Sequence, residues 1–85
     1  MIMVDPPAWP GHGRLWSHLA SDESFEELHE FAVALGLPAR GFDGDHYDLP
    51  AADYQRAVDA GAVEMSSRDL VARLIAAGLR RRKLR

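Results

Sequence analysis

The 85-residue sequence has no cysteine, one lysine and no long apolar run. Without cysteine the chain cannot form disulfide bonds, thiolate zinc sites or cysteine nucleophiles, and this composition is typical of a reducing cytoplasm. A membrane-spanning helix needs roughly 20 consecutive apolar residues, and no segment approaches that length. The first residues, MIMVDPP, have no basic region before an apolar stretch and do not predict a secretory signal. We therefore expect a cytoplasmic protein that does not associate with membranes.

The charged residues are unevenly distributed along the chain. The formal net charge is −3, but residues 80–85, RRRKLR, contain five of the ten basic residues. The preceding residues contain five basic and thirteen acidic side chains, a net charge of −8. Because a nucleic-acid-binding domain is expected to present a basic surface, we expect nucleic-acid contact only through this tail. The simplest role of the tail is to place cations at the carboxyl end of the last helix.

The length allows one domain, which we assign to residues 1–79, followed by the basic C-terminal tail at 80–85. A domain of this size buries only roughly 60–65% of the surface that its unfolded chain exposes. Contact with a second copy could therefore matter, and a homo-oligomer is one expectation. The nine arginines against one lysine, with abundant alanine, indicate a GC-rich bacterial genome.

Phosphate binding has little support in the sequence. There is no P-loop and no GxGxxG segment, so the common nucleotide-binding loops are excluded. The remaining support is the free N–H groups at two helix starts and a few basic side chains. These are Ser24 and Ser66 for the helix starts, and Arg14, Arg40 and Arg68 for the basic side chains.

The first part of the chain predicts a strand, an irregular segment and a helix. Residues 1–4, MIMV, are apolar and partly β-branched and predict a buried strand. Residues 6–23 contain three prolines and two glycines and predict a long irregular connection. Ser24 and Glu27 form a capping box, so a helix is expected to begin there and to end at Gly36.

The rest of the chain repeats the alternation of strands and helices. The predicted segments are a strand at 39–43 that continues after a turn into 46–49, a helix from Pro50 to Gly61, a strand at 62–65 and a helix from Ser66 to Gly78. This order favours a small α/β domain with a three-stranded, mostly parallel sheet, three helices (βαβαβα) and right-handed crossovers. Ligands of such sheets bind outside the carboxyl ends of the strands, where Asp5 would lie.

The segment GFDGDHYDLP, residues 41–50, concentrates charged and aromatic side chains between glycine and proline. On a strand, His46 and Asp48 would face the same side while Tyr47 turns into the core. This spacing suits either a histidine oriented by a carboxylate or two ligands of one metal ion. The alternative is a polar turn in which Asp43 and Asp45 cap the backbone and His46 is merely exposed.

Other histidines could join this pair in a metal site. His29 lies at the border of the buried face of the first helix. Either its ring packs against the core with its polar end in solvent, or it points into a cleft. A divalent metal ion such as zinc could be bound by some of these side chains with a position left open for water. The candidate ligands are His18, His29, His46, Asp48 and Asp5. No local HExxH spacing is present, and adjacent Ser17 and His18 would point apart, which argues against a nucleophile–base pair.

Four segments together are similar to a known family. They are LWSHL at 15–19, SFEELHEFAVALGLP at 24–38, HYDLP at 46–50 and AGAVEMSSRDLVARL at 60–74. They resemble the small bacterial and phage proteins called domain of unknown function 4031. Members of this family have, in order along the chain, a His-Leu step, an ELH-containing helix, an HYD step, a GA turn, a short strand and a last helix.

The resemblance implies a shared pattern of residues and no established activity. That pattern includes His18, His29, His46, Asp48 and an early acidic residue such as Asp5. Many relatives carry a longer insertion before the HYD step, often with Trp-Phe-Gln where this chain has GFDGD. The resemblance therefore implies that Asp43 and Asp45 are not general site residues.

Two classes of function fit these residues. The first is a small metal-assisted hydrolase with His46 as ligand or general base, Asp48 orienting it and His18 as a further catalytic residue. The alternative is a non-enzymatic module that binds a small molecule or a protein partner through the same cluster. The cluster could also be structural and join the irregular segment 6–23 to the helix and strand.

Overall fold

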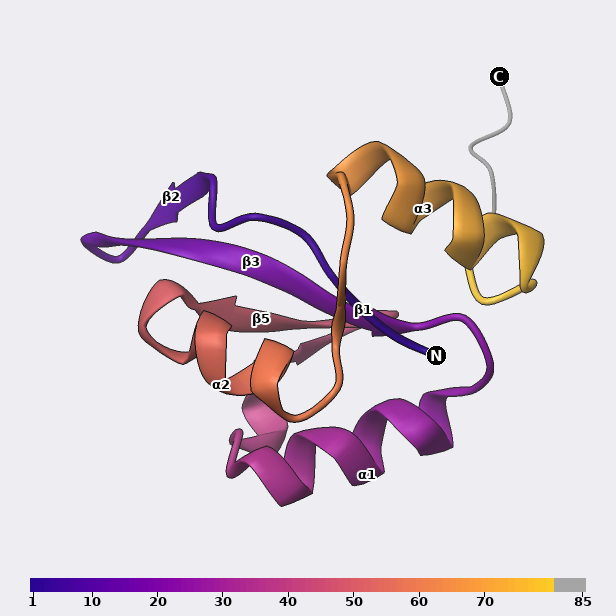
Figure 1. The fold of residues 1–85 in the computed structure, drawn as a ribbon, viewed down its shortest axis with the longest axis horizontal. Helices are drawn as coiled ribbons and strands as arrows, with labels where there is room; N and C mark the ends of the chain where they lie inside the picture. The colour runs from indigo at the N-terminus through magenta and orange to yellow at the C-terminus, as the bar shows by residue number, and fades with distance from the viewer. Residues whose placement is uncertain (81–85) are drawn as a thin grey trace.

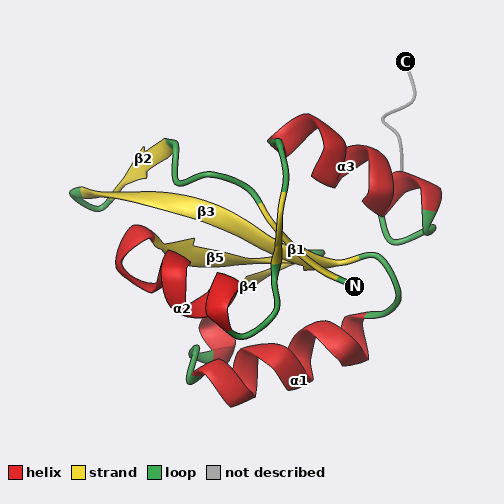
Figure 2. Ribbon diagram, in the orientation of Figure 1, coloured by secondary structure: helices red, strands yellow, loops and turns green. Residues whose placement is uncertain are grey.

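The computed structural model describes residues 1–80, which form one mixed β-sheet with helices on both faces (Figures 1 and 2). The strands are β1 (Ile2–Val4), β2 (Trp9–Gly11), β3 (Arg14–Ser21), β4 (Phe42–Asp43), β5 (His46–Pro50) and β6 (Val63–Glu64). The helices are α1 (Phe25–Leu35), α2 (Tyr54–Asp59) and α3 (Ser67–Ala76). Residues 81–85 lie outside the described range, and so does the predicted role of most of the basic tail.

The sheet differs from the predicted three-stranded, mostly parallel one. Its six strands run in the order β4-β5-β3-β1-β6, with β2 paired to β3 off this path. Only β1 and β6 are parallel, and every other pair is antiparallel. The predicted fold class was therefore wrong. Two hairpins, β2–β3 and β4–β5, add antiparallel strands that the predicted alternation of strands and helices did not include.

The first hairpin occupies the segment predicted to be irregular. His12 and Gly13 both have positive φ, 51° and 75°, and they form a two-residue turn that pairs Gly11 with Arg14. Positive φ at both turn residues matches the right-handed twist of the flanking strands. The prolines that suggested a loop lie before and within the short β2, where a missing N–H is tolerated at an edge strand.

The second hairpin divides the strand predicted from residue 39 onward. Gly44, with φ of 73°, and Asp45 turn the chain so that Asp43 pairs with His46. Residues 39–41 form a 3₁₀ turn in place of strand. The hairpin makes β5 antiparallel to β4, and β5 also pairs with β3 in antiparallel register.

The predicted boundaries of the first and last helices are confirmed, whereas the middle helix, expected from Pro50, begins only at Tyr54, because Pro50 ends β5 and residues 51–53 form a 3₁₀ turn. The Ser24 side chain accepts from the N–H of Glu27 at the start of α1, and Gly36 takes the left-handed conformation after it with φ of 81°. The Ser66 side chain likewise accepts from the N–H of Asp69 at the start of α3. Within the part of the chain that is described, each helix is too short or too polar to cross a bilayer.

The two faces of the sheet carry separate clusters of buried side chains. Alternate residues of β1, β3 and β5 pack against α1 and α2 on one face. On the opposite face α3 covers only part of the sheet, where Met3 and Ala20 contact Leu70 and Leu74 (Figure 1). The rest of this second face carries polar side chains of β3 and β5, of which His18 and His46 lie at the edge of α3 and line a small cavity with its residues.

We expect Leu74→Ala to lower the free energy of unfolding by about 2–5 kcal/mol, because it leaves a cavity between α3 and the sheet. Leu74 is fully buried. The matched control is Val33→Ala on α1, where a side chain that is 76% exposed should change stability by less than about 0.5 kcal/mol. Urea denaturation measures both, and equal effects of the two substitutions would contradict the packing of α3 described here.

Candidate functional site

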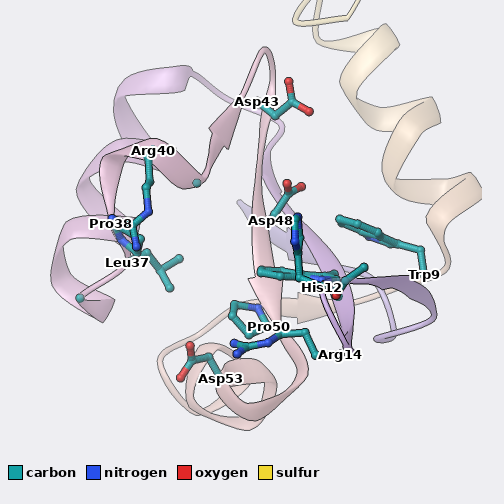
Figure 3. A pocket seen from close by; sticks show the side chains of 14 residues that line it. Trp9, His12, Arg14, Leu37, Pro38, Arg40, Asp43, Asp48, Pro50 and Asp53 are labelled. Carbon is teal, nitrogen blue, oxygen red and sulfur yellow. Dashed lines mark hydrogen bonds between the residues drawn. The ribbon is translucent and has the colours of Figure 1, made fainter.

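The second sheet face gathers the polar side chains of β3 and β5 at the edge of α3. His18 on β3 is paired in register with Asp48 on β5. His46 and Asp48 share this face, while Tyr47 between them is buried on the other, as the alternation predicts. A groove of about 720 Å³ opens beside the face, between the β2–β3 hairpin and the segment that follows α1 (Figure 3).

Asp5 is the buried centre of one part of the site. It follows β1 and is only 1% exposed. Its Oδ1 accepts from the backbone N–H of His18 at 2.6 Å, and its Oδ2 lies 2.7 Å from His18 Nδ1. The hydroxyl of Ser67, the first residue of α3, donates to the same Oδ2 at 2.6 Å.

These contacts shift the ionisation of both partners. Burial works to raise the pKa of Asp5, but the hydrogen bonds from His18 and Ser67 outweigh it and hold the pKa below its usual value. The hydrogen bond to Asp5 raises the pKa of His18, against the opposing effect of burial. The pair is therefore stabilised as a carboxylate beside an imidazole whose Nδ1 carries a proton.

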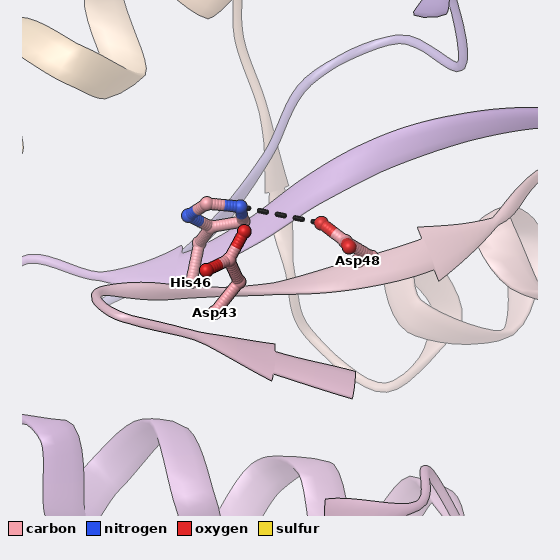
Figure 4. Close-up of side chains that lie close together, drawn as sticks. All are labelled: Asp43, His46 and Asp48. Atoms are coloured by element: carbon pink, nitrogen blue, oxygen red, sulfur yellow. Dashed lines mark ion pairs between the residues drawn. The ribbon is translucent and has the colours of Figure 1, made fainter. Parts of the chain in front are cut away.

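His46 has carboxylates at both ring nitrogens. Its Nδ1 is 2.8 Å from Asp45 Oδ1, and its Nε2 is 3.2 Å from Asp48 Oδ1, the contact drawn in Figure 4. Arg80 binds Asp45 through two nitrogens at 2.7 and 3.1 Å. Burial would raise the pKa of Asp45, but Arg80 and His46 hold it below its usual value.

The two histidines lie next to each other. The rings of His18 and His46 meet edge to face with centroids 4.9 Å apart. The Trp9 ring stacks on His18 at 5.6 Å. Both histidines, together with Ser67 and Arg80, line a small cavity of about 60 Å³, which is large enough for water.

One group of side chains in residues 1–80 has a spacing compatible with a metal ion. Asp43, His46 and Asp48 each offer a ligand atom, and these atoms lie within 4.8 Å of one another (Figure 4). Ligand atoms bound to one ion at about 2.0–2.2 Å lie roughly 3–4 Å apart. The exposed Asp43 side chain can rotate to close this difference.

The structure brings together four of the five candidate ligands. His18, His46 and Asp48 share one face of the sheet, and Asp5 contacts this group through His18. His29 is separate from them, because it lies on α1 at the opposite face. There its Nδ1 is 2.7 Å from the Tyr47 hydroxyl.

Five site residues were not among the sequence candidates. Asp43 and Asp45 were set aside as general site residues, and Trp9, Ser67 and Arg80 were not considered for the site. A two-residue Gly-Asp turn between short strands is a known hairpin signal, and it would have placed Asp43 opposite His46. Arg80 carries no such signal, because its contact with Asp45 spans 35 residues.

Comparison with known proteins identifies a family and no characterised relative. A family model described as "Protein of unknown function (DUF4031)" matches residues 2–77. This match confirms the resemblance found in the sequence. Neither the curated proteins nor the solved structures include a significant match.

We expect Asp5→Asn to lower the free energy of unfolding by about 1–3 kcal/mol at neutral pH, because a charged, hydrogen-bonded acceptor is lost in the interior. In a proton NMR titration with a chelator present, the pKa of His18 should fall, since its main cause of elevation is removed. Asp59→Asn, at an exposed carboxylate on α2, is the matched control and should leave both quantities unchanged.

The difference in free energy of unfolding between the wild type and Asp5→Asn should depend on pH in a defined direction. The lowered pKa of Asp5 contributes stability above its unfolded value of 3.8, and this contribution is lost as the pH falls through the lower folded value. The raised pKa of His18 contributes stability below 6.5, and this is lost as the pH rises through the higher folded value. A stability difference that is independent of pH would contradict the pairing.

Proposed function

The chain belongs to the family of proteins of unknown function 4031, and from its own geometry we propose that it is a metal-assisted hydrolase. The proposed metal ligands are Asp43, His46 and Asp48, and the proposed general base is His18. One observation carries the proposal, namely that both ring nitrogens of His46 face carboxylate oxygens.

A neutral imidazole has one N–H and one lone pair. If His46 donates from Nδ1 to Asp45, its Nε2 lone pair faces the lone pairs of Asp48 across 3.2 Å. A cation near Nε2 converts this unfavourable contact into a favourable one. Asp43 adds a second carboxylate oxygen within 4.8 Å, so the same cation would have three ligands.

The surroundings of His46 are those of a metal ligand. A ligating histidine usually donates its other N–H to a carboxylate, which fixes the ring and its tautomer. Asp45 has that position, and Arg80 neutralises its charge. Two carboxylates and one imidazole suit Zn²⁺ or Mn²⁺ and leave coordination positions for water and substrate.

His18 is placed to act as the base. Its Nδ1 is occupied by Asp5, so its Nε2 is the nitrogen left to accept a proton. A metal ion on Asp43, His46 and Asp48 would make a nearby water more acidic. In hydrolysis the oxygen of the attacking water would bond to the electrophilic atom of the substrate while His18 accepts the water's proton. The bond to the leaving group then breaks, and His18 returns the proton to that group.

The alternative function, a non-enzymatic binding module, would use the same side chains without the reaction. The buried Asp5 hydrogen bonds are equally consistent with a rigid binding surface. Metal content and turnover distinguish the two functions.

We expect the untagged protein to bind one Zn²⁺ or Mn²⁺ per chain, and His46→Ala and Asp48→Asn to weaken binding at least tenfold. Isothermal titration and elemental analysis measure the affinity and the stoichiometry. His29→Ala removes a histidine from the opposite face and is the matched control, which should bind as the wild type does. Equal affinity in His46→Ala and His29→Ala would refute the metal site.

His18→Gln should separate metal binding from hydrolysis. We expect metal affinity within about threefold of wild type, because His18 is not a proposed ligand. Turnover of chromogenic phosphate and carboxylic esters should fall roughly 10²–10⁴-fold, the usual contribution of a general base. Unchanged turnover would show that another group accepts the proton, and no turnover by the metal-loaded wild type would favour the binding module.

A further inference from the structure

The groove beside the metal cluster has an aromatic wall. Trp9 and Trp16 are cross-strand partners in the β2–β3 hairpin, and their rings stack with centroids 5.7 Å apart and planes 19° apart. Trp16 Nε1 donates to the Gly11 carbonyl at 2.8 Å, which fixes its ring. Both rings line the groove, so its wall is flat, rigid and apolar.

Two cations lie on opposite sides of this groove. Arg14 comes from the β2–β3 hairpin and Arg40 from the segment after α1 (Figure 3). Within residues 1–80 neither arginine has a carboxylate partner, whereas three other arginines do; these are Arg56, Arg73 and Arg80. The Arg14 guanidinium lies over the Trp16 ring at 5.7 Å. At an exposed site such a contact is worth only about 0.5–1 kcal/mol, so Arg14 is easily drawn to an anion.

The groove is continuous with the proposed metal site. Asp43 and Asp48 belong both to its lining and to the metal cluster. Its volume of about 720 Å³ lies within the range of roughly 300–1,000 Å³ typical of small-molecule sites. An anionic group near the arginines would therefore be adjacent to a metal ion on the two aspartates.

We propose that this groove binds a free nucleoside phosphate, with the planar base on the tryptophan wall and the phosphate between the arginines and the metal cluster. Aromatic walls hold bases by stacking, at about 1–3 kcal/mol per base, and guanidinium groups form charge-assisted bonds with phosphate. A neutral sugar would leave the arginines without a partner, and an inorganic anion would leave the aromatic wall unused.

The reaction of this ligand rests on the proposed function. In this hydrolysis the oxygen of water would bond to phosphorus, and the bond between phosphorus and the ester oxygen would break. The ester oxygen would leave with the proton that His18 took from the water. The products are inorganic phosphate and a nucleoside. Binding of the nucleotide itself requires no reaction and is measured separately.

Intrinsic fluorescence tests binding directly, because the only two tryptophans of the chain both line the groove. The full chain is titrated, in separate series with chelator and with Zn²⁺, with adenosine or guanosine monophosphate, the matching nucleoside, inorganic phosphate and a short single-stranded oligonucleotide. We expect a saturable change with the nucleotide and at least tenfold weaker binding of nucleoside and phosphate. Arg40→Ala and Arg14→Ala should weaken nucleotide binding at least fivefold, and Arg68→Ala on the surface of α3 should not.

Three results would overturn the proposal. They are no saturable change with any mononucleotide up to millimolar concentration, equal binding of nucleotide and nucleoside, and binding of the oligonucleotide alone. The chelator series does not depend on the metal site, and because Asp43 and Asp48 then repel the phosphate, the nucleotide should bind more weakly there than with Zn²⁺. Conversely, if the chain binds the metal but no nucleotide, the proposed hydrolase function still stands and only the proposed substrate is refuted.

Discussion

The fold and the site both depend on the buried carboxylate of Asp5. It accepts hydrogen bonds from the backbone and ring of His18 and from the Ser67 hydroxyl, and so joins the end of β1, the middle of β3 and the start of α3. An unpaired carboxylate in the interior costs several kcal/mol. These three segments are therefore held in one arrangement, which fixes how far α3 extends over the sheet.

The partial cover by α3 determines where polar chemistry can occur. One strand, β5, directs Tyr47 and Leu49 into the core and His46 and Asp48 to the opposite face. Because α3 reaches only the edge of this group, the side chains of His18 and Asp48 stay 33% and 31% exposed. The same alternation that builds the core thus presents the site, and the core on the first face supports it.

Local signals predicted part of this structure and non-local pairing determined the rest. Capping residues such as Ser24 contact only the next turn of their own helix, so the helix boundaries could be read from the sequence. The face shared by His46 and Asp48 also follows from strand alternation. The sheet could not be read in this way, because the partner of β3 is set by hairpin turns and by contacts far apart in the sequence. The position of His29 could not be predicted for the same reason, because a border position on a helix does not determine which face of the sheet the helix packs against.

The two neighbouring histidines have different surroundings, and this difference supports different roles. His18 is fixed at one nitrogen by a buried carboxylate and is covered on its ring by Trp9, so its second nitrogen is the one that can exchange a proton. His46 is engaged at both nitrogens, by Asp45 with its arginine partner and by Asp48. A ring fixed at Nδ1 by Asp45 keeps one orientation, so its Nε2 could bind an ion in a defined position. Their rings lie 4.9 Å apart, so the proposed base and the proposed ligand are close enough to act on one water molecule.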